Sequence, residues 1–165
     1  MSRVSLSKRK LDEDEARDPA RVRASALRLL ARREHSSLEL QGKLAARGYA
    51  SDAIGPVLAA LEDKKLLSDA RFVEEFVAAR VRRGSGPMKI REELRGRGVA
   101  SELVDQAVAA HRGAWGAMAE EARRKRFGAG RPKDMQERAR QARFLQQRGF
   151  SMEDIRKALK GDVED

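Results

Sequence analysis

The sequence predicts an all-α protein built as an elongated, curved array of three tandem three-helix repeats. The main observation is a tripeptide of Arg, Gly and either an aromatic residue or Val. It occurs as Arg47-Gly48-Tyr49, Arg97-Gly98-Val99 and Arg148-Gly149-Phe150, so that its glycines are 50 and 51 residues apart. A fixed period of this size is typical of stacked helical units. No segment alternates apolar and polar residues with a period of two, so we expect no β-strand.

The residues around the three glycines repeat as well. A leucine lies four residues before each glycine, and a β-branched aliphatic residue lies six residues after it. In a helical unit the leucine ends one amphipathic helix, the glycine takes the left-handed position after it, and the aliphatic residue lies in the next helix. A serine near the start of that next helix comes one position earlier in the third unit. These residues are Leu44, Leu94 and Leu145, then Ile54, Val104 and Ile155, then Ser51, Ser101 and Ser151.

The period divides the chain into four segments. Residues 1–17 combine charged runs with few apolar residues, so we expect them to form a disordered tail. Repeat 1 is expected over residues 18–67, repeat 2 over residues 68–111 and repeat 3 over residues 112–165, each with three helices.

Local signals in repeat 1 place its helix starts. Asp18-Pro19 combines a good N-cap residue with a proline at the first helical position. Ser36 and Glu39 have the spacing of a capping box. Pro56 lies five residues after Ser51 and leaves two alternatives open, a helix that begins two residues later or a helix that bends.

The positive charge of the chain is large and uneven. The 165 residues include 36 Lys and Arg against 26 Asp and Glu, which gives a formal net charge of +10. Between Arg123 and Arg148 ten basic residues meet two acidic ones, and in repeat 2 the basic residues gather on both sides of Gly84-Ser85-Gly86. Such patches suit a polyanion, most often nucleic acid, or an acidic protein surface. The alternative is a set of solvated helix faces in a basic chain.

The candidate contact residues are basic side chains that leave the apolar stripes free. In repeat 2 they are Arg71, Arg82, Arg83, Lys89, Arg91, Arg95 and Arg97, followed by Arg32, Arg33 and Arg143 elsewhere in the chain. The phenylalanines could stack on bases, but at helical spacing we expect them in the core. They are Phe72, Phe76, Phe127, Phe144 and Phe150.

Nothing in the sequence indicates an enzyme, a cofactor or a metal site. The chain has no cysteine, which fits a reducing cytoplasm and excludes disulfides, thiolate metal sites and thiol nucleophiles. His35 and His111 are isolated in polar stretches, and the loop Gly128–Lys133 lacks the spacing of a phosphate-binding loop. No apolar run reaches 18 residues, so no membrane span is expected.

Two stretches carry a resemblance to a known family. Residues 67–72, Leu-Ser-Asp-Ala-Arg-Phe, followed by residues 86–94 and Gly98-Val99, resemble the central signature of the bacterial RecX regulatory proteins. Ser37-Leu38-Glu39-Leu40, with Leu44 and Gly48, is similar to the pattern of that family's first unit. The likeness covers about residues 20–160, and Lys65-Leu66 replaces the family's usual glycine before the Leu-x-Asp run.

The resemblance implies a fold, a partner and a function. RecX proteins consist of three tandem three-helix units, bind the RecA recombinase mainly as its filament on single-stranded DNA, and suppress its activities in DNA repair and the SOS response. The array is thought to lie in the helical groove of the filament. The resemblance therefore implies a cytoplasmic monomer whose partners are RecA and, directly or through the filament, single-stranded DNA. The alternative is a stand-alone, non-specific nucleic-acid-binding protein that competes for DNA.

Overall fold

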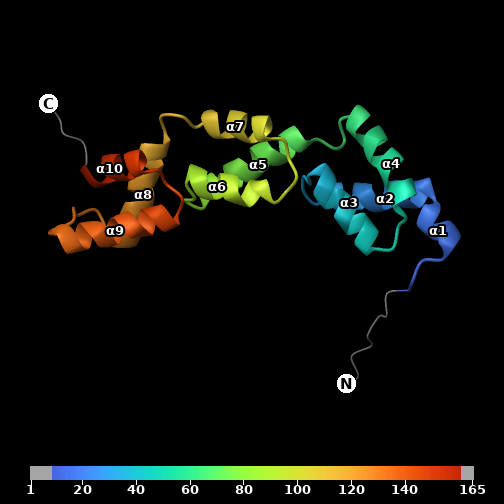
Figure 1. Ribbon diagram of the computed structural model, residues 1–165, viewed down its shortest axis with the longest axis horizontal. Coiled ribbons are helices and arrows are strands. Elements are labelled where there is room, and N and C mark those ends of the chain that lie inside the picture. Colours follow the sequence, from blue (N-terminus) through green and yellow to red (C-terminus); the bar gives the residue numbers. More distant parts are fainter. Residues whose placement is uncertain (1–8, 161–165) are drawn as a thin grey trace, which may run out of the picture. The chain divides into compact units, whose positions relative to one another are not determined.

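The computed structural model describes residues 9–160, which form ten α-helices and no strand (Figure 1). The all-α prediction is confirmed. The chain divides into two compact units, residues 1–69 and residues 70–165, so that repeats 2 and 3 belong to one unit. The helices of repeat 1 and the segment before it are α1 (Glu13–Arg17), α2 (Pro19–Leu30), α3 (Ser37–Ala46) and α4 (Ser51–Asp63). Those that follow are α5 (Asp69–Arg82), α6 (Pro87–Arg95), α7 (Ser101–Ala109), α8 (Trp115–Phe127), α9 (Met135–Gln147) and α10 (Met152–Lys160).

Helix α1 lies where the sequence predicts a disordered tail. The Asp12 carboxylate accepts a hydrogen bond from the Glu15 amide, and the Glu15 carboxylate accepts one from the Asp12 amide. This reciprocal capping box stabilises a short helix in a charged segment. The Ala50 amide then donates to the Ala16 carbonyl at 2.9 Å and ties α1 to the turn between α3 and α4. The tail prediction is wrong for α1, and the first eight residues lie outside the described part of the chain.

The helix starts of repeat 1 follow the sequence signals closely. Asp18 caps α2 with Pro19 as its first residue, and the Ser36 hydroxyl accepts a hydrogen bond from the Glu39 amide at 3.1 Å. Helix α4 begins at Ser51 and continues through Pro56 to Asp63, so its start is not delayed. The first unit closes around buried apolar residues of three helices, among them Val22, Ala26, Leu40, Leu44, Ile54, Leu58 and Leu61.

The three glycines of the repeated tripeptide are all in the left-handed region. Their φ angles are 98° at Gly48, 69° at Gly98 and 91° at Gly149. After Gly48 and Gly149 the next amide donates back across the helix end, from Tyr49 to the Leu44 carbonyl at 3.3 Å and from Phe150 to the Leu145 carbonyl at 3.2 Å. This is the Schellman arrangement, which satisfies terminal carbonyls and favours glycine because it has no Cβ.

The one-residue shift of the serine in the third unit has a structural reason. Ser51 and Ser101 are the first helical residues of α4 and α7, and neither helix has a side-chain cap. Ser151 lies just before α10, and its hydroxyl accepts a hydrogen bond from the Asp154 amide at 3.1 Å. Only the shifted serine therefore acts as an N-cap.

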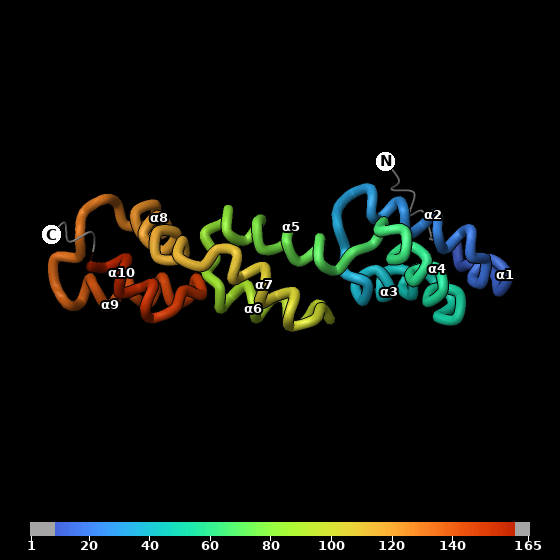
Figure 2. The backbone as a smooth tube through the Cα atoms, turned by 90° about the horizontal axis from the view of Figure 1, so that it is seen from above, coloured from blue at the N-terminus to red at the C-terminus, as the bar shows by residue number. Residues whose placement is uncertain are grey.

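Repeats 2 and 3 are joined by a backbone latch, which we define as the contact of the turn at Gly149 with the start of α6. The Gly86 amide donates to the Arg148 carbonyl at 2.7 Å, and the Met88 amide donates to the Gly149 carbonyl at 2.9 Å. The turn between α9 and α10 lies beside the start of α6 in Figure 1 and Figure 2. The third tripeptide thus supplies acceptors to amides at the start of α6 that have no partner within that helix. The two repeats also share one hydrophobic core, which runs from Phe72 to Leu159.

The latch predicts that the three glycines of the tripeptide differ in importance. A Cβ on Gly149 would lie 2.4 Å from the Lys89 Cβ and 2.5 Å from its amide nitrogen, whereas one on Gly48 would meet only the Leu11 side chain at 3.7 Å. Gly149→Ala should therefore lower the free energy of unfolding of the second unit by about 3 kcal/mol or more. Gly48→Ala should cost the first unit about 1 kcal/mol, from the left-handed backbone alone.

Urea unfolding measures both effects separately. Trp115, the single tryptophan, is buried in the second unit and reports on that unit by its fluorescence. Gly149→Ala should move the fluorescence transition to lower urea concentration, and Gly48→Ala should leave that transition in place while lowering the stability seen by circular dichroism. Equal, small losses of stability in both variants would mean that the latch does not hold the repeats together.

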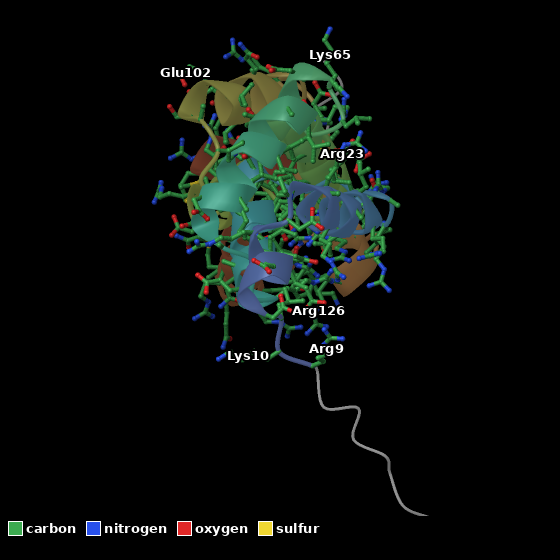
Figure 3. The ribbon with its side chains drawn as sticks, turned by 90° about the vertical axis from the view of Figure 1, so that its right-hand side faces the viewer. Arg9, Lys10, Arg23, Lys65, Glu102 and Arg126 are labelled. Carbon is green, nitrogen blue, oxygen red and sulfur yellow. The ribbon has the colours of Figure 1, made fainter. Side chains whose placement is uncertain are left out.

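A second prediction concerns the turn after α4, where Lys65 has a φ of 58° and is the one non-glycine residue with positive φ between residues 9 and 160. The Leu66 amide donates to the Leu61 carbonyl at 2.9 Å, which is the Schellman bond seen at the glycine turns. Lys65 projects outward at the top of Figure 3. Lys65→Gly should raise the free energy of unfolding of the first unit by about 0.5–1 kcal/mol, because only the Cβ strains this backbone.

Lys65→Ala is the matched control, since it removes the charge but keeps the Cβ. Thermal unfolding followed by circular dichroism should show an increase in stability for Lys65→Gly and no comparable increase for Lys65→Ala. An increase of the same size in both variants would assign the effect to the charge and contradict backbone strain as its cause.

Candidate interaction surface

Three of the predicted contact residues come together at the turn between α5 and α6, and we call them the α5–α6 patch. Arg82 is the last residue of α5, Arg83 follows it, and Lys89 lies in the first turn of α6. Gly84 reverses the chain between them with a φ of 79°. All three side chains are exposed and have no ion-pair partner within residues 9–160. Their charges are therefore available to a polyanion.

Arg148 extends this patch from repeat 3. Its guanidinium donates to the Arg83 carbonyl at 3.2 Å and lies over the Phe144 ring, 5.3 Å from the ring centroid. Arg148 is not among the contact residues predicted from the sequence, because the tripeptide explains it as part of a turn.

Two other candidates of repeat 2 are already engaged with acids. Arg91 forms an ion pair with Asp105, and the Arg95 guanidinium lies 2.7 Å from a Glu92 carboxylate oxygen. The second pair is exposed on both sides, so it contributes little to stability and leaves Arg95 able to exchange partners. The pairing of Arg91 depends on where α6 and α7 meet, which the sequence does not reveal, whereas Glu92 and Arg95 lie three residues apart within α6.

Two further arginines of repeat 2 contact the ring of Phe76. The Arg80 guanidinium lies 4.3 Å from the Phe76 ring centroid and that of Arg97 lies 5.6 Å from it. Arg80 also pairs with Glu93 at 2.5 Å. Arg97 and Arg71 are half-buried, in contrast to the exposed α5–α6 patch. Half-burial of these arginines, together with the ion pair of Arg80 to Glu93, holds their guanidinium groups against the protein and favours a structural contribution.

The candidates of the first unit differ from each other. Arg33 donates two hydrogen bonds to the Glu39 carboxylate, at 2.5 and 3.2 Å, and the hydrogen bond to Glu39 raises the pKa of Arg33. Arg32 beside it is exposed and has no ion-pair partner within the described range 9–160. Of this pair, Arg32 is therefore the better candidate for an external anion.

His35 is buried, although its sequence neighbourhood is polar. Its exposed fraction is 1%, with Nδ1 3.0 Å from the Arg33 carbonyl and Nε2 3.0 Å from the Lys43 ammonium. Burial lowers the pKa of His35, which favours a neutral ring that donates from Nδ1 and accepts at Nε2. These contacts give His35 a structural role. No group of three or more metal-ligating side chains occurs among residues 9–160.

Arg123 is the buried exception in the basic stretch of repeat 3. Its exposed fraction is 2%, and its guanidinium bonds to both Glu120 oxygens, at 2.8 and 3.0 Å, and to the Gly130 carbonyl at 3.0 Å. The hydrogen bond from Arg123 lowers the pKa of Glu120. Arg123 therefore fixes the loop after α8, although the glycines of that loop are typical of a flexible connector.

Three other arginines of repeat 3, Arg126, Arg140 and Arg148, lie beside two aromatic rings. Phe127 and Phe144 meet edge to face with centroids 5.3 Å apart. The guanidinium of Arg140 lies 5.3 Å from the Phe127 centroid and that of Arg126 lies 5.6 Å from it. We call Arg126, Phe127, Arg140, Arg143, Phe144 and Arg148 the α8–α9 strip. Of its arginines, only Arg143 was among the contact residues predicted from the sequence, but the spacing of Arg140, Phe144 and Arg148 at every fourth residue was a usable signal. Both phenylalanines were expected in the core; Phe144 packs against it, but Phe127 is not part of it, so that expectation is wrong for Phe127.

The second unit also contains a groove of about 1630 Å³. Six basic and five acidic side chains line it, together with Trp115. Because the two signs nearly balance, the groove does not favour a polyanion in the way that the α5–α6 patch and the α8–α9 strip do. No helix between residues 9 and 160 has the length and apolar composition needed to cross a bilayer.

Comparison with known families identifies all three repeats. Residues 23–61, 68–108 and 117–159 match the models described as the first, second and third three-helix domains of RecX. A protein named Regulatory protein RecX from Halorhodospira halophila is 49% identical over 144 residues, which cover 87% of this chain and 89% of the relative. Its counterpart from Chromohalobacter salexigens is 50% identical over 141 residues, 85% of this chain and 91% of the relative.

Solved structures agree on the fold. A crystal structure of regulatory protein RecX aligns with a TM-score of 0.76 at 20% identity over 93% of this chain and 81% of that chain. RecX from Lactobacillus salivarius aligns with a TM-score of 0.72 at 19% identity over 86% of this chain and 94% of that one. The three domain matches and the relatives of about 50% identity show that the chain belongs to the RecX family of regulatory proteins.

Proposed function

We propose that this RecX-family chain binds the filament of the RecA recombinase on single-stranded DNA, in its helical groove, and inhibits recombination and related activities. In this way it would modulate DNA repair and the SOS response as a monomer in the cytoplasm. The observation that carries the proposal is the match of all three domains, in order, to one family of regulatory proteins. The α5–α6 patch supports it by placing unpaired positive charge on repeat 2.

The repeat architecture suits a partner that is itself periodic. Three similar domains in one chain can each make a weak contact with successive subunits of a filament, and such contacts reinforce one another through a high effective concentration. Inhibition then requires only that the chain binds some filament states more tightly than others. Filament states that cannot extend or exchange strands become more populated when the chain binds them preferentially.

The ion pairs in repeat 2 divide the candidate residues by availability. Arg82, Arg83 and Lys89 can meet carboxylates or phosphates without breaking an internal ion pair. Arg91 and Arg95 must first leave or share Asp105 and Glu92. We therefore assign the main filament contact to the α5–α6 patch, with Arg91 and Arg95 at its margin.

Charge reversal at the patch tests this assignment. Arg82→Glu with Arg83→Glu should raise the concentration needed for half-inhibition of the DNA-dependent ATPase of RecA about tenfold, since two exposed charge contacts contribute about 0.7 kcal/mol each. The salt dependence of inhibition should also become weaker. Helix content should stay unchanged, because both side chains lie outside the core.

The matched control is Arg124→Glu with Lys125→Glu, which changes the net charge equally at two exposed residues of α8. Inhibition by this control should stay close to that of the unmodified chain. Equally weakened inhibition in both double variants would point to net charge rather than to the patch. Electron microscopy of RecA filaments on single-stranded DNA should show added density in the groove, and bare filaments at inhibiting concentrations would contradict the proposal.

A further inference from the structure

We propose that the α8–α9 strip is a binding surface for single-stranded nucleic acid that works without RecA. Its guanidinium groups would hold phosphates, and the rings of Phe127 and Phe144 would stack on bases. This goes beyond the proposed function, which requires only that repeat 2 contacts a filament. The strip lies in repeat 3, so the two surfaces can be tested separately.

Some basic side chains of α8 form ion pairs with carboxylates, whereas the exposed arginines of the strip form none in the part of the chain that the structure describes. The Arg124 guanidinium lies 2.8 Å from a Glu120 carboxylate oxygen and the Lys125 ammonium lies 3.0 Å from one of Glu121, so the charges of these two basic residues of α8 are neutralised. The strip differs in this respect. Within the described range 9–160, the exposed side chains of the strip have no carboxylate at ion-pair distance. These exposed arginines are Arg126, Arg140 and Arg143.

The two rings of the strip are only partly used by the core. Phe127 is half-buried and is not among the apolar side chains that form or pack against the core of the second unit. Phe144 packs against that core but is only half-buried, and the Arg148 guanidinium lies over its ring. Partly exposed aromatic rings beside guanidinium groups are a kind of surface on which unpaired bases stack.

The strip is also continuous with the basic residues of repeat 2. Arg140, Phe144 and Arg148 follow each other at intervals of four residues and span about 12 Å along α9, at about 1.5 Å per residue. That length corresponds to about three or four nucleotides at roughly 3.4 Å each. Arg148 then bonds to the Arg83 carbonyl at 3.2 Å, so the strip continues into the α5–α6 patch.

The rings also decide between two classes of partner. The carboxylates of an acidic protein surface would pair with the arginines but would make no use of the rings, because carboxylates do not stack on phenyl rings. A duplex would offer phosphates, but its bases are already stacked and paired. Guanidinium groups beside partly exposed rings match the alternation of phosphates and bases in a single strand.

The test is fluorescence anisotropy of a labelled dT20 oligonucleotide, titrated with the full chain in the absence of RecA at several salt concentrations. Arg140→Gln with Arg143→Gln should weaken binding about tenfold at low salt and reduce the salt slope by about 1.4, at about 0.7 for each phosphate that is no longer bound. Phe127→Leu with Phe144→Leu should weaken binding about five- to tenfold without a comparable change of slope, because stacking is not ionic. Arg124→Gln with Lys125→Gln is the control, because it removes two basic side chains that already form ion pairs with Glu120 and Glu121. This variant should bind within about twofold of the unmodified chain.

Several results would overturn the proposal. One is that the unmodified chain does not bind dT20 at low salt. Another is that the control variant loses as much affinity as the variant with both Arg140 and Arg143 changed. If a duplex of the same length binds as tightly as dT20, the strip does not recognise single strands. If poly-glutamate displaces dT20 equally well from the unmodified chain and from the phenylalanine variant, the strip binds polyanions in general. Circular dichroism and Trp115 fluorescence verify that each variant is folded. If the phenylalanine variant is not folded, the arginine variant alone tests the proposal.

Discussion

The close approach of two backbones at Gly86 and Gly149 is the contact on which the second unit depends. A Cβ on either glycine would lie 2.4 Å from an atom of the facing segment. Only without side chains at both positions can the Arg148 and Gly149 carbonyls accept from the Gly86 and Met88 amides. The tripeptide therefore has two functions in repeat 3, since it ends α9 and also caps α6. In repeat 1 the corresponding turn binds α1 through the Ala16 carbonyl.

The latch also determines which positive charges come together. By seating the turn at Gly149 on the first residues of α6, it places Arg148 against the end of α5. The exposed arginines of repeats 2 and 3 thereby share one unit, while Arg123 and Arg80 are held by Glu120 and Glu93. Acidic residues within hydrogen-bonding reach thus separate the arginines that stabilise the fold from those that are free for a partner.

The sequence predicted the helices well, because their signals are local. The left-handed glycines and the caps at Asp18 and Ser36 depend on residues within one or two turns of each other. The capping box of α1 is equally local, but it was hidden in a run of charges. The contact surface was harder to predict. The pairing of Arg91 with Asp105 and the burial of His35 depend on packing between helices, which periodicity does not reveal.

The two basic surfaces differ in what they can recognise. The α5–α6 patch consists of exposed cations without aromatic rings, so it can distinguish partners only by charge and shape. The α8–α9 strip adds ring faces, which distinguish an unpaired base from a carboxylate. If the chain binds a protein filament as proposed, the two surfaces would allow it to contact both the protein and the strand within it. Because the latch joins the two surfaces in one unit, a single strand bound to the strip would lead directly to the patch assigned to the filament.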